Sequence, residues 1–139
     1  MSFTIVVDEN IPFARETFGR LGSLTLLPGR AIGPAEVRHA DALLVRSVTR
    51  VGRAPLDGSR VKFVGTATIG VDHVDTDYLS NQRIAFASAP GSNANSVAEY
   101  VIAALLLMAA EQGSRLEGAV IGVVGVGNVG SRVVAKAQA

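Results

Sequence analysis

The stretch Val120-Ile121-Gly122-Val123-Val124-Gly125-Val126-Gly127-Asn128-Val129-Gly130 places a β-branched run directly before a glycine-rich turn. A helix is predicted to follow, from Asn128 to Gln138. In strand–turn–helix units of this kind, the first glycine permits a tight turn, the second lets the backbone approach a pyrophosphate, and the third allows close packing. Free N–H groups and the positive end of the helix dipole favour an anion there. The stretch therefore predicts a dinucleotide site formed by Gly125, Gly127, Asn128, Val129 and Gly130.

This predicted site is incomplete within the sequence. The acidic residue that binds the ribose hydroxyls normally lies about 20 residues further on, beyond Ala139. The predicted strand 119–124 also has no second parallel strand after it. We therefore expect half a nucleotide site in a part of a longer protein. A plain glycine turn is the alternative.

Upstream of this unit, short apolar runs alternate with helical stretches, which predicts an α/β, doubly wound parallel sheet. The runs are apolar throughout, as expected for strands that are covered on both faces. Five strands are predicted at residues 4–7, 24–27, 42–45, 61–64 and 84–87, with a sixth at 119–124. Helices are predicted from Pro12 towards Gly22, from Pro34 to Ala40, and from Ser96 to Gln112, with Asp8-Glu9-Asn10 as an N-cap cluster.

The composition excludes several classes of protein. The 139 residues are 48% hydrophobic and 18% charged, which argues against intrinsic disorder. A net charge of +1 favours neither nucleic acid nor an anionic membrane as a partner. The absence of Cys and the presence of only two His argue against a metal site. The start of the chain lacks the features of a signal peptide, and the apolar run 101–110 is half the length of a membrane span. We therefore expect a cytoplasmic protein.

Polar side chains follow the third strand in Val45-Arg46-Ser47-Val48-Thr49. Ligands of open α/β sheets bind at the carboxyl ends of the strands. Arg46 has the fork geometry that suits an anion, and Ser47 offers a hydroxyl. An ordinary surface arginine beside a turn-capping serine is the alternative interpretation.

Two further loops carry candidate binding residues. The small residues of Gly65-Thr66-Ala67-Thr68-Ile69-Gly70 leave backbone N–H groups free to bind an anion. His73, which follows this loop, is interpreted as a structural histidine in a turn. The loop before the long helix contains Asn93, but good N-cap residues and Glu99 in the first turn suffice to explain its sequence.

The acidic pair Asp8-Glu9 after the first strand raises the alternative of a phosphoacceptor receiver domain. A receiver needs an Asp after the third strand and a Lys after the fifth. Those positions hold Arg46-Ser47 and Ser88-Ala89, so this alternative is rejected.

The segments 7–12, 45–49, 63–68 with 72–75, and 122–130 together resemble the D-isomer-specific 2-hydroxyacid dehydrogenase family. The resemblance implies a five-stranded flavodoxin-like substrate domain, a long helix, and the first βα unit of a Rossmann domain that binds NAD. It implies a small anionic substrate that contacts Ser47 and Thr68, with Arg46, Gly70 and Asn93 nearby. The Arg, Glu and His that act in catalysis in the family lie after the glycine motif. None of them has a counterpart here, so no catalytic residue is assigned.

The expected organisation is a substrate-binding domain at 1–92, an interdomain helix and linker at 93–117, and the start of the NAD-binding domain at 118–139. A homo-oligomer formed through residues 96–139 is expected, because the apolar helix must be covered on all sides. The alternative to an enzyme fragment is a self-sufficient flavodoxin-like binding or interaction module without catalysis.

Overall fold

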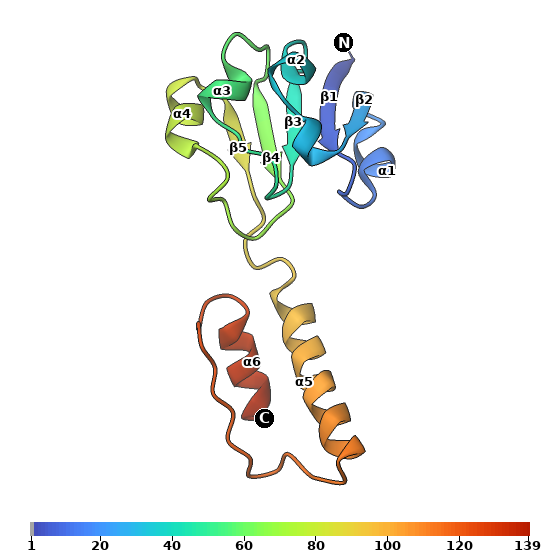
Figure 1. The fold of residues 1–139 in the computed structure, drawn as a ribbon, viewed down its shortest axis with the longest axis vertical. Coiled ribbons are helices and arrows are strands. Elements are labelled where there is room, and N and C mark those ends of the chain that lie inside the picture. The colour runs from blue at the N-terminus through green and yellow to red at the C-terminus, as the bar shows by residue number, and fades with distance from the viewer. Residues whose placement is uncertain (1) are drawn as a thin grey trace. The chain divides into compact units, whose positions relative to one another are not determined.

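The computed structural model describes residues 2–139 and consists of two compact units, Met1–Ala89 and Pro90–Ala139 (Figure 1). The first contains all five strands of the described chain, and the second contains its two longest helices.

The first unit is built on a parallel sheet with strand order β2-β1-β3-β4-β5, which is the flavodoxin-like order. This confirms the predicted α/β doubly wound sheet of five strands. The third strand has the predicted bounds, whereas the fourth begins two residues later than expected because the Val61 amide donates to Ser59 Oγ rather than to the sheet. The strands are β1 (Phe3–Asp8), β2 (Gly22–Leu27), β3 (Ala42–Val45), β4 (Phe63–Thr66) and β5 (Ala85–Ala87).

The helices of the first unit are short. They are α1 (Ala14–Phe18), the 3-10 helix η1 (Gly29–Ala31), α2 (Pro34–Val37), α3 (Arg53–Leu56) and α4 (Thr76–Asn81). The expected helix from Pro12 begins only at Ala14, because Phe13 adopts a left-handed conformation with φ of 57°. The sequence patterns did not predict η1, α3 or α4. In α4, the Asp75 side chain caps the helix by accepting a hydrogen bond from the Tyr78 amide.

The expected helix cap at Asp8-Glu9-Asn10 is wrong. Asp8 is buried at the end of β1, and its Oδ1 accepts hydrogen bonds from the backbone amide and the side-chain Nδ2 of Asn10. This is an Asx-type turn that closes on itself, four residues before α1 begins. The side chain stabilises the turn after the strand, and not the following helix.

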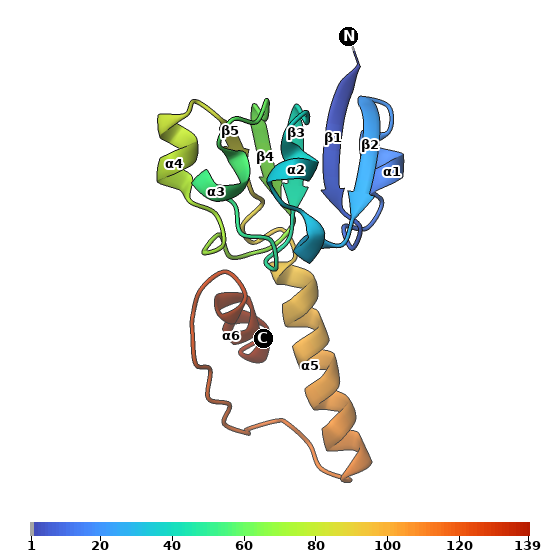
Figure 2. The ribbon, with the colours of Figure 1, turned by 45° about the horizontal axis from the view of Figure 1, so that its top comes forward.

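The two faces of the sheet differ in how completely they are covered. One face is covered by α2, α3 and α4 (Figure 2). It carries a large buried cluster that includes Val37 of α2, Leu56 of α3 and Leu79 of α4. The other face has a smaller cluster under α1. Beyond α1, an open apolar groove of about 260 Å³ runs along β4 and β5, beside Phe63 and Ala87. The expectation that all strands are covered on both faces therefore fails for β4 and β5.

The second unit is a pair of packed helices, α5 (Ala94–Glu111) and α6 (Gly130–Ala137), joined by an irregular segment (Figure 1). Lys136 Nζ of α6 lies 3.2 Å from Glu99 Oε1 of α5, which also accepts a hydrogen bond from Asn95. Both contacts lower the pKa of Glu99, the contact with Lys136 most strongly.

The predicted sixth strand at 119–124 is wrong for this structure. No residue of that segment forms a strand, and Val120 and Val124 are fully exposed. The physical reason is that residues 2–139 offer this segment no neighbouring strand, and an isolated extended chain leaves its backbone groups unpaired.

Helix α5 is longer than the apolar run 101–110 suggested. Its 18 residues have a mean hydropathy of 1.4, so by length and composition alone it is able to cross a membrane. The core helix of a soluble protein passes the same test. The run length therefore does not exclude a span.

Candidate functional site

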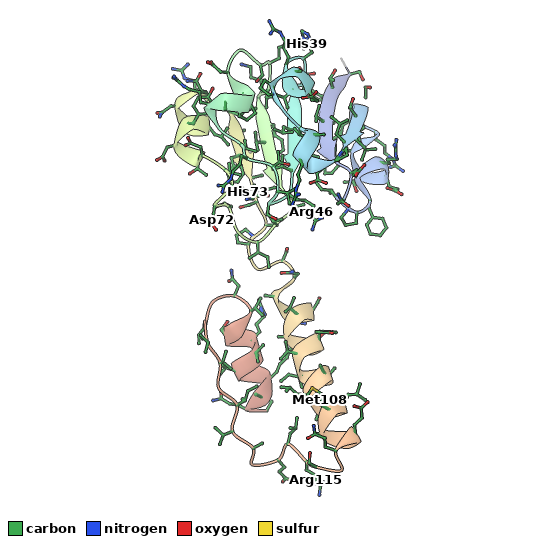
Figure 3. The ribbon with its side chains drawn as sticks, viewed as in Figure 1. His39, Arg46, Asp72, His73, Met108 and Arg115 are labelled. Atoms are coloured by element: carbon green, nitrogen blue, oxygen red, sulfur yellow. The ribbon has the colours of Figure 1, made fainter. Side chains whose placement is uncertain are left out.

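A polar cavity of about 180 Å³ opens at the carboxyl edge of the sheet in the first unit. Figure 3 labels Arg46, Asp72 and His73 at this edge. The cavity is formed by the loops that follow β3 and β4, as expected for a ligand site in an open α/β sheet. Its lining residues are Ser47, Arg50, Thr68, Gly70, Asp72 and His73.

A chain of hydroxyl groups connects the sheet to this cavity. His73 Nε2 lies 3.0 Å from Thr66 Oγ1, which lies 2.9 Å from Thr68 Oγ1. Thr68 Oγ1 in turn donates to the Gly70 carbonyl oxygen at 3.2 Å. Thr66 and His73 are both buried, and His73 and Thr68 line the cavity.

The backbone of the loop after β4 supplies further donors. Within residues 2–139, the amides of residues 68–73 donate to no protein acceptor. Successive free N–H groups in a loop of small residues form a concave anion site. Of the predicted loop Gly65–Gly70, only residues 68–70 keep free amides, because the Ala67 amide donates to the Val45 carbonyl oxygen and Gly65 and Thr66 lie in β4. The anion site stays a prediction.

Arg50 is the cationic side chain of the cavity. Its Nη1 donates to the Asp72 carbonyl oxygen at 3.2 Å, which holds the guanidinium beside the loop. The pKa of His73 is lowered, first by burial and then by the positive charge of Arg50, while Asp72 opposes the shift. His73 is therefore neutral near pH 7.

The structure brings together three of the predicted substrate residues, Ser47, Thr68 and Gly70. Arg46 is exposed at the same edge and is not among the residues that line the cavity. Asn93 lies in the second unit, where it precedes α5 without capping it through its side chain. The roles predicted for all five residues stay predictions.

Arg50 and Asp72 were not selected from the sequence. Arg50 ends a turn after β3, in which Thr49 N donates to Arg46 O and Thr49 is buried. This turn carries Arg50 to the neighbouring loop. The one feature of the sequence that could have indicated Arg50 is its position as a second basic residue, four positions after Arg46.

The glycine-rich segment forms the predicted turn before α6, but without the strand expected before it, and α6 begins at Gly130 rather than at Asn128. Gly125 has a φ of +89°, which favours glycine. A side chain at Gly130 would collide with the Gly125 carbonyl oxygen, whereas a Cβ at Gly127 would meet only open space. The Ser131 hydroxyl donates to Gly127 O at 2.7 Å, which ties the turn to α6.

This turn fits the first half of a dinucleotide site. Within residues 2–139, the amides of residues 125–129 donate to no protein acceptor, and Asn128 lies next to Gly91. Free amides at a helix N-terminus suit a pyrophosphate. Among the described residues, no cluster of three His, Asp or Glu side chains is placed to hold a metal ion.

Comparison with known proteins agrees with this architecture. Erythronate-4-phosphate dehydrogenase of Chromohalobacter salexigens is 63% identical over 129 residues, which cover 93% of this chain and 34% of the relative. The Salmonella arizonae protein of the same name is 53% identical over 135 residues, which cover 97% and 36%. The chain thus spans about a third of the length of these curated relatives.

Solved structures show the same fold at lower identity. D-lactate dehydrogenase from Aquifex aeolicus, complexed with NAD and lactic acid, matches with a TM-score of 0.67 and 24% identity, over 97% of this chain and 48% of that one. NAD+-bound 3-phosphoglycerate dehydrogenase of Entamoeba histolytica matches with a TM-score of 0.69 and 24% identity, over 99% and 51%. Residues 29–136 match the family described as D-isomer specific 2-hydroxyacid dehydrogenase, catalytic domain. The chain belongs to this family.

Proposed function

We propose that this chain supplies the substrate-binding unit and the first part of the NAD-binding unit of an erythronate-4-phosphate dehydrogenase. The enzyme would oxidise 4-phospho-D-erythronate with NAD, a step towards pyridoxal phosphate, in the cytoplasm. The proposal is supported by the two relatives of that name, which are 53% and 63% identical across nearly the whole chain.

The observation that carries the proposal is the polar cavity of the first unit. Ser47 and Thr68 offer hydroxyl donors, the loop 68–73 offers free amides, and Arg50 offers a positive charge. A substrate with a carboxylate and a phosphate needs such a set of donors, since hydrogen bonds to charged groups are the stronger ones. We propose Arg46, which is exposed at the same edge, as the contact for the second anionic group.

The glycine-rich turn would hold the pyrophosphate of NAD on the amides of residues 125–129. When bound, NAD accepts the hydride that the hydroxyl-bearing carbon of the substrate loses. We propose that the residues of this chain bind and orient the substrate, and that the proton of that hydroxyl goes to a base of the longer protein, as the family resemblance implies. We therefore propose that the chain alone is inactive and binds NAD weakly or not at all.

Isothermal titration calorimetry of the 139-residue chain with 4-phospho-D-erythronate tests the substrate assignment. We expect measurable binding that Ser47→Ala weakens, and weaker binding of D-erythronate, which lacks the phosphate. A Glu117→Gln variant is the control, because Glu117 is exposed in the second unit. Equal binding of both ligands would contradict the phosphate assignment.

An activity assay tests the remainder of the proposal. We expect no NAD reduction by the 139-residue chain and phosphoerythronate-dependent NAD reduction by the longer protein that contains it. Turnover by the chain alone would show that the base lies within residues 1–139. Phosphate-ligand binding by a longer protein without NAD reduction would favour the alternative, a binding module.

A further inference from the structure

The feature that the proposed function leaves unused is the buried pair Thr66 and His73, of which His73 also lines the cavity. Neither side chain is needed to complete the sheet, and His73 is only 7% exposed. A polar side chain is costly to bury unless it is hydrogen-bonded, so its partners have to account for its presence. Here the partners lead, one hydrogen bond at a time, to Thr68 at the cavity.

The direction of this hydrogen-bond chain follows from counting protons. The Gly70 carbonyl oxygen only accepts, so Thr68 uses its single hydroxyl proton there. Thr66 must then donate to Thr68, and the Thr66 oxygen must accept from His73 Nε2. This order requires a proton on Nε2 of the imidazole.

From this geometry we propose that His73 is a positioning residue, whose Nε2–H orients the Thr66 hydroxyl and, through it, presents the Thr68 hydroxyl as a donor to the anionic substrate. The proposal rests on the proposed function for the identity of the substrate. The Thr68 proton points to the Gly70 carbonyl oxygen, at the edge of the cavity. A bound carboxylate or phosphate oxygen would replace that carbonyl, with the two upstream hydrogen bonds unchanged.

The alternative direction is unfavourable for binding. With a proton on Nδ1, Nε2 would accept from Thr66, and Thr66 would accept from Thr68. Thr68 would then turn its oxygen lone pairs towards the cavity and repel an anion. Because the pKa of His73 is lowered, its imidazole is neutral and carries one proton, on either Nδ1 or Nε2. The tautomer therefore determines whether Thr68 presents a donor or an acceptor to the cavity.

The tautomer is measured on the 139-residue chain itself by long-range ¹H–¹⁵N NMR of its imidazoles. We expect Nδ1 of His73 to be the unprotonated nitrogen, whereas exposed His39 serves as the reference for an unconstrained ring. Thr66→Val, which removes the acceptor, should let both tautomers of His73 appear, and Thr66→Ser should restore the single form. A protonated Nδ1 in the wild-type chain would overturn the proposal.

Steady-state kinetics of the longer dehydrogenase test the consequence. We expect Thr66→Val to raise the KM for 4-phospho-D-erythronate about tenfold, the effect of one hydrogen bond to a charged group. The KM for NAD should stay unchanged, and Thr66→Ser should restore the wild-type value. Equal effects of Val and Ser, or a parallel rise in the KM for NAD, would overturn the positioning role.

A second pair of variants separates donor geometry from loss of the ring. His73→Gln keeps an N–H donor near the Nε2 position, whereas the amide of His73→Asn stops short of Thr66. We expect the Gln variant to have the lower KM of the two; equal values would count against the proposal. If the wild-type enzyme does not oxidise 4-phospho-D-erythronate, the proposed function fails while the tautomer measurement still decides the geometry.

Discussion

Two segments of this chain have nearly the same composition but different structures. Thr4-Ile5-Val6-Val7 forms the buried strand β1, and Val120-Ile121-Gly122-Val123-Val124 stays irregular with its valines largely in solvent. β1 is paired on both sides, with β2 and with β3. The later segment has no strand beside it within residues 2–139.

The difference shows that a β-branched run is a strand only where neighbours complete its hydrogen bonds and cover its side chains. In the first unit, other strands of the same unit pair with β1, and other residues of the unit cover its side chains. The second unit provides only helix α5 as a packing partner for α6. The first unit therefore has a closed core on one face, and the second has apolar surface that still needs a partner.

The largest expected effect separates the cores of these two regions. Leu43 of β3 is 0% exposed, so Leu43→Ala should lower the free energy of unfolding by about 2–5 kcal/mol. Val124→Ala, at an exposed position, should change it by less than about 0.5 kcal/mol. Urea unfolding is followed by the NMR signals of Tyr78, which packs against the core of the first unit, and of Tyr100 in α5, so that each variant is measured in its own unit. A similar loss in the two variants would contradict the contrast.

A smaller effect is expected from the binding groups of the first unit. Arg50→Ala removes the cation of the cavity and should weaken 4-phospho-D-erythronate binding roughly 10- to 100-fold. Arg46→Ala should weaken it less, because Arg46 is exposed and does not line the cavity. In the longer dehydrogenase, the affinity for NAD should stay unchanged in both variants. Calorimetry with each ligand measures these affinities. A larger loss of substrate affinity in Arg46→Ala than in Arg50→Ala would show that Arg46 makes the main contact with the anion.

The apolar surface of the second unit should cause self-association. Leu106 and Leu107 of α5 are more than half exposed, and Val124 adds further apolar area. We expect light scattering at micromolar concentration to give a dimer or a larger oligomer of the 14.4 kDa chain. Leu106→Glu should weaken the association roughly tenfold, since it removes apolar burial and adds a charge. A monomer under these conditions would show that the surface is covered in some other way.

The sequence predicts the fold well where local pattern and long-range pairing agree. The predicted strand 42–45 agrees with β3 at both ends. Its short apolar run is bounded by polar residues, and β1 and β4 pair with it on either side. The strand 119–124 was wrong because no local pattern states whether a partner is present. The short helices α3 and α4 were missed because four to six residues carry too little periodicity to register.

The candidate site was predictable in part for a related reason. Ser47 and Thr68 lie two residues after β3 and β4, and Gly70 follows in the same loop, so the sheet places them at one edge. Arg50 reaches the cavity through the turn after β3, and Asp8 closes its own turn; both depend on loop geometry. His73 was expected to be structural, and its hydrogen bond to Thr66 depends on a contact between a strand and a loop.

The smallest expected effect is a pH dependence confined to the first unit, since both histidines lie there. Burial and Arg50 lower the pKa of His73 below its ordinary value of 6.5, so the unfolded chain binds the proton more readily. Stability contributed by neutral His73 is therefore complete above about pH 6.5 and is lost as the pH falls towards the lower pKa of the folded state. His73→Gln should remove this dependence, whereas His39→Gln, at an exposed position, should keep it. Urea unfolding of the three proteins between about pH 5 and 8 measures it, and stability of the wild type that rises on acidification would reverse the sign argued here.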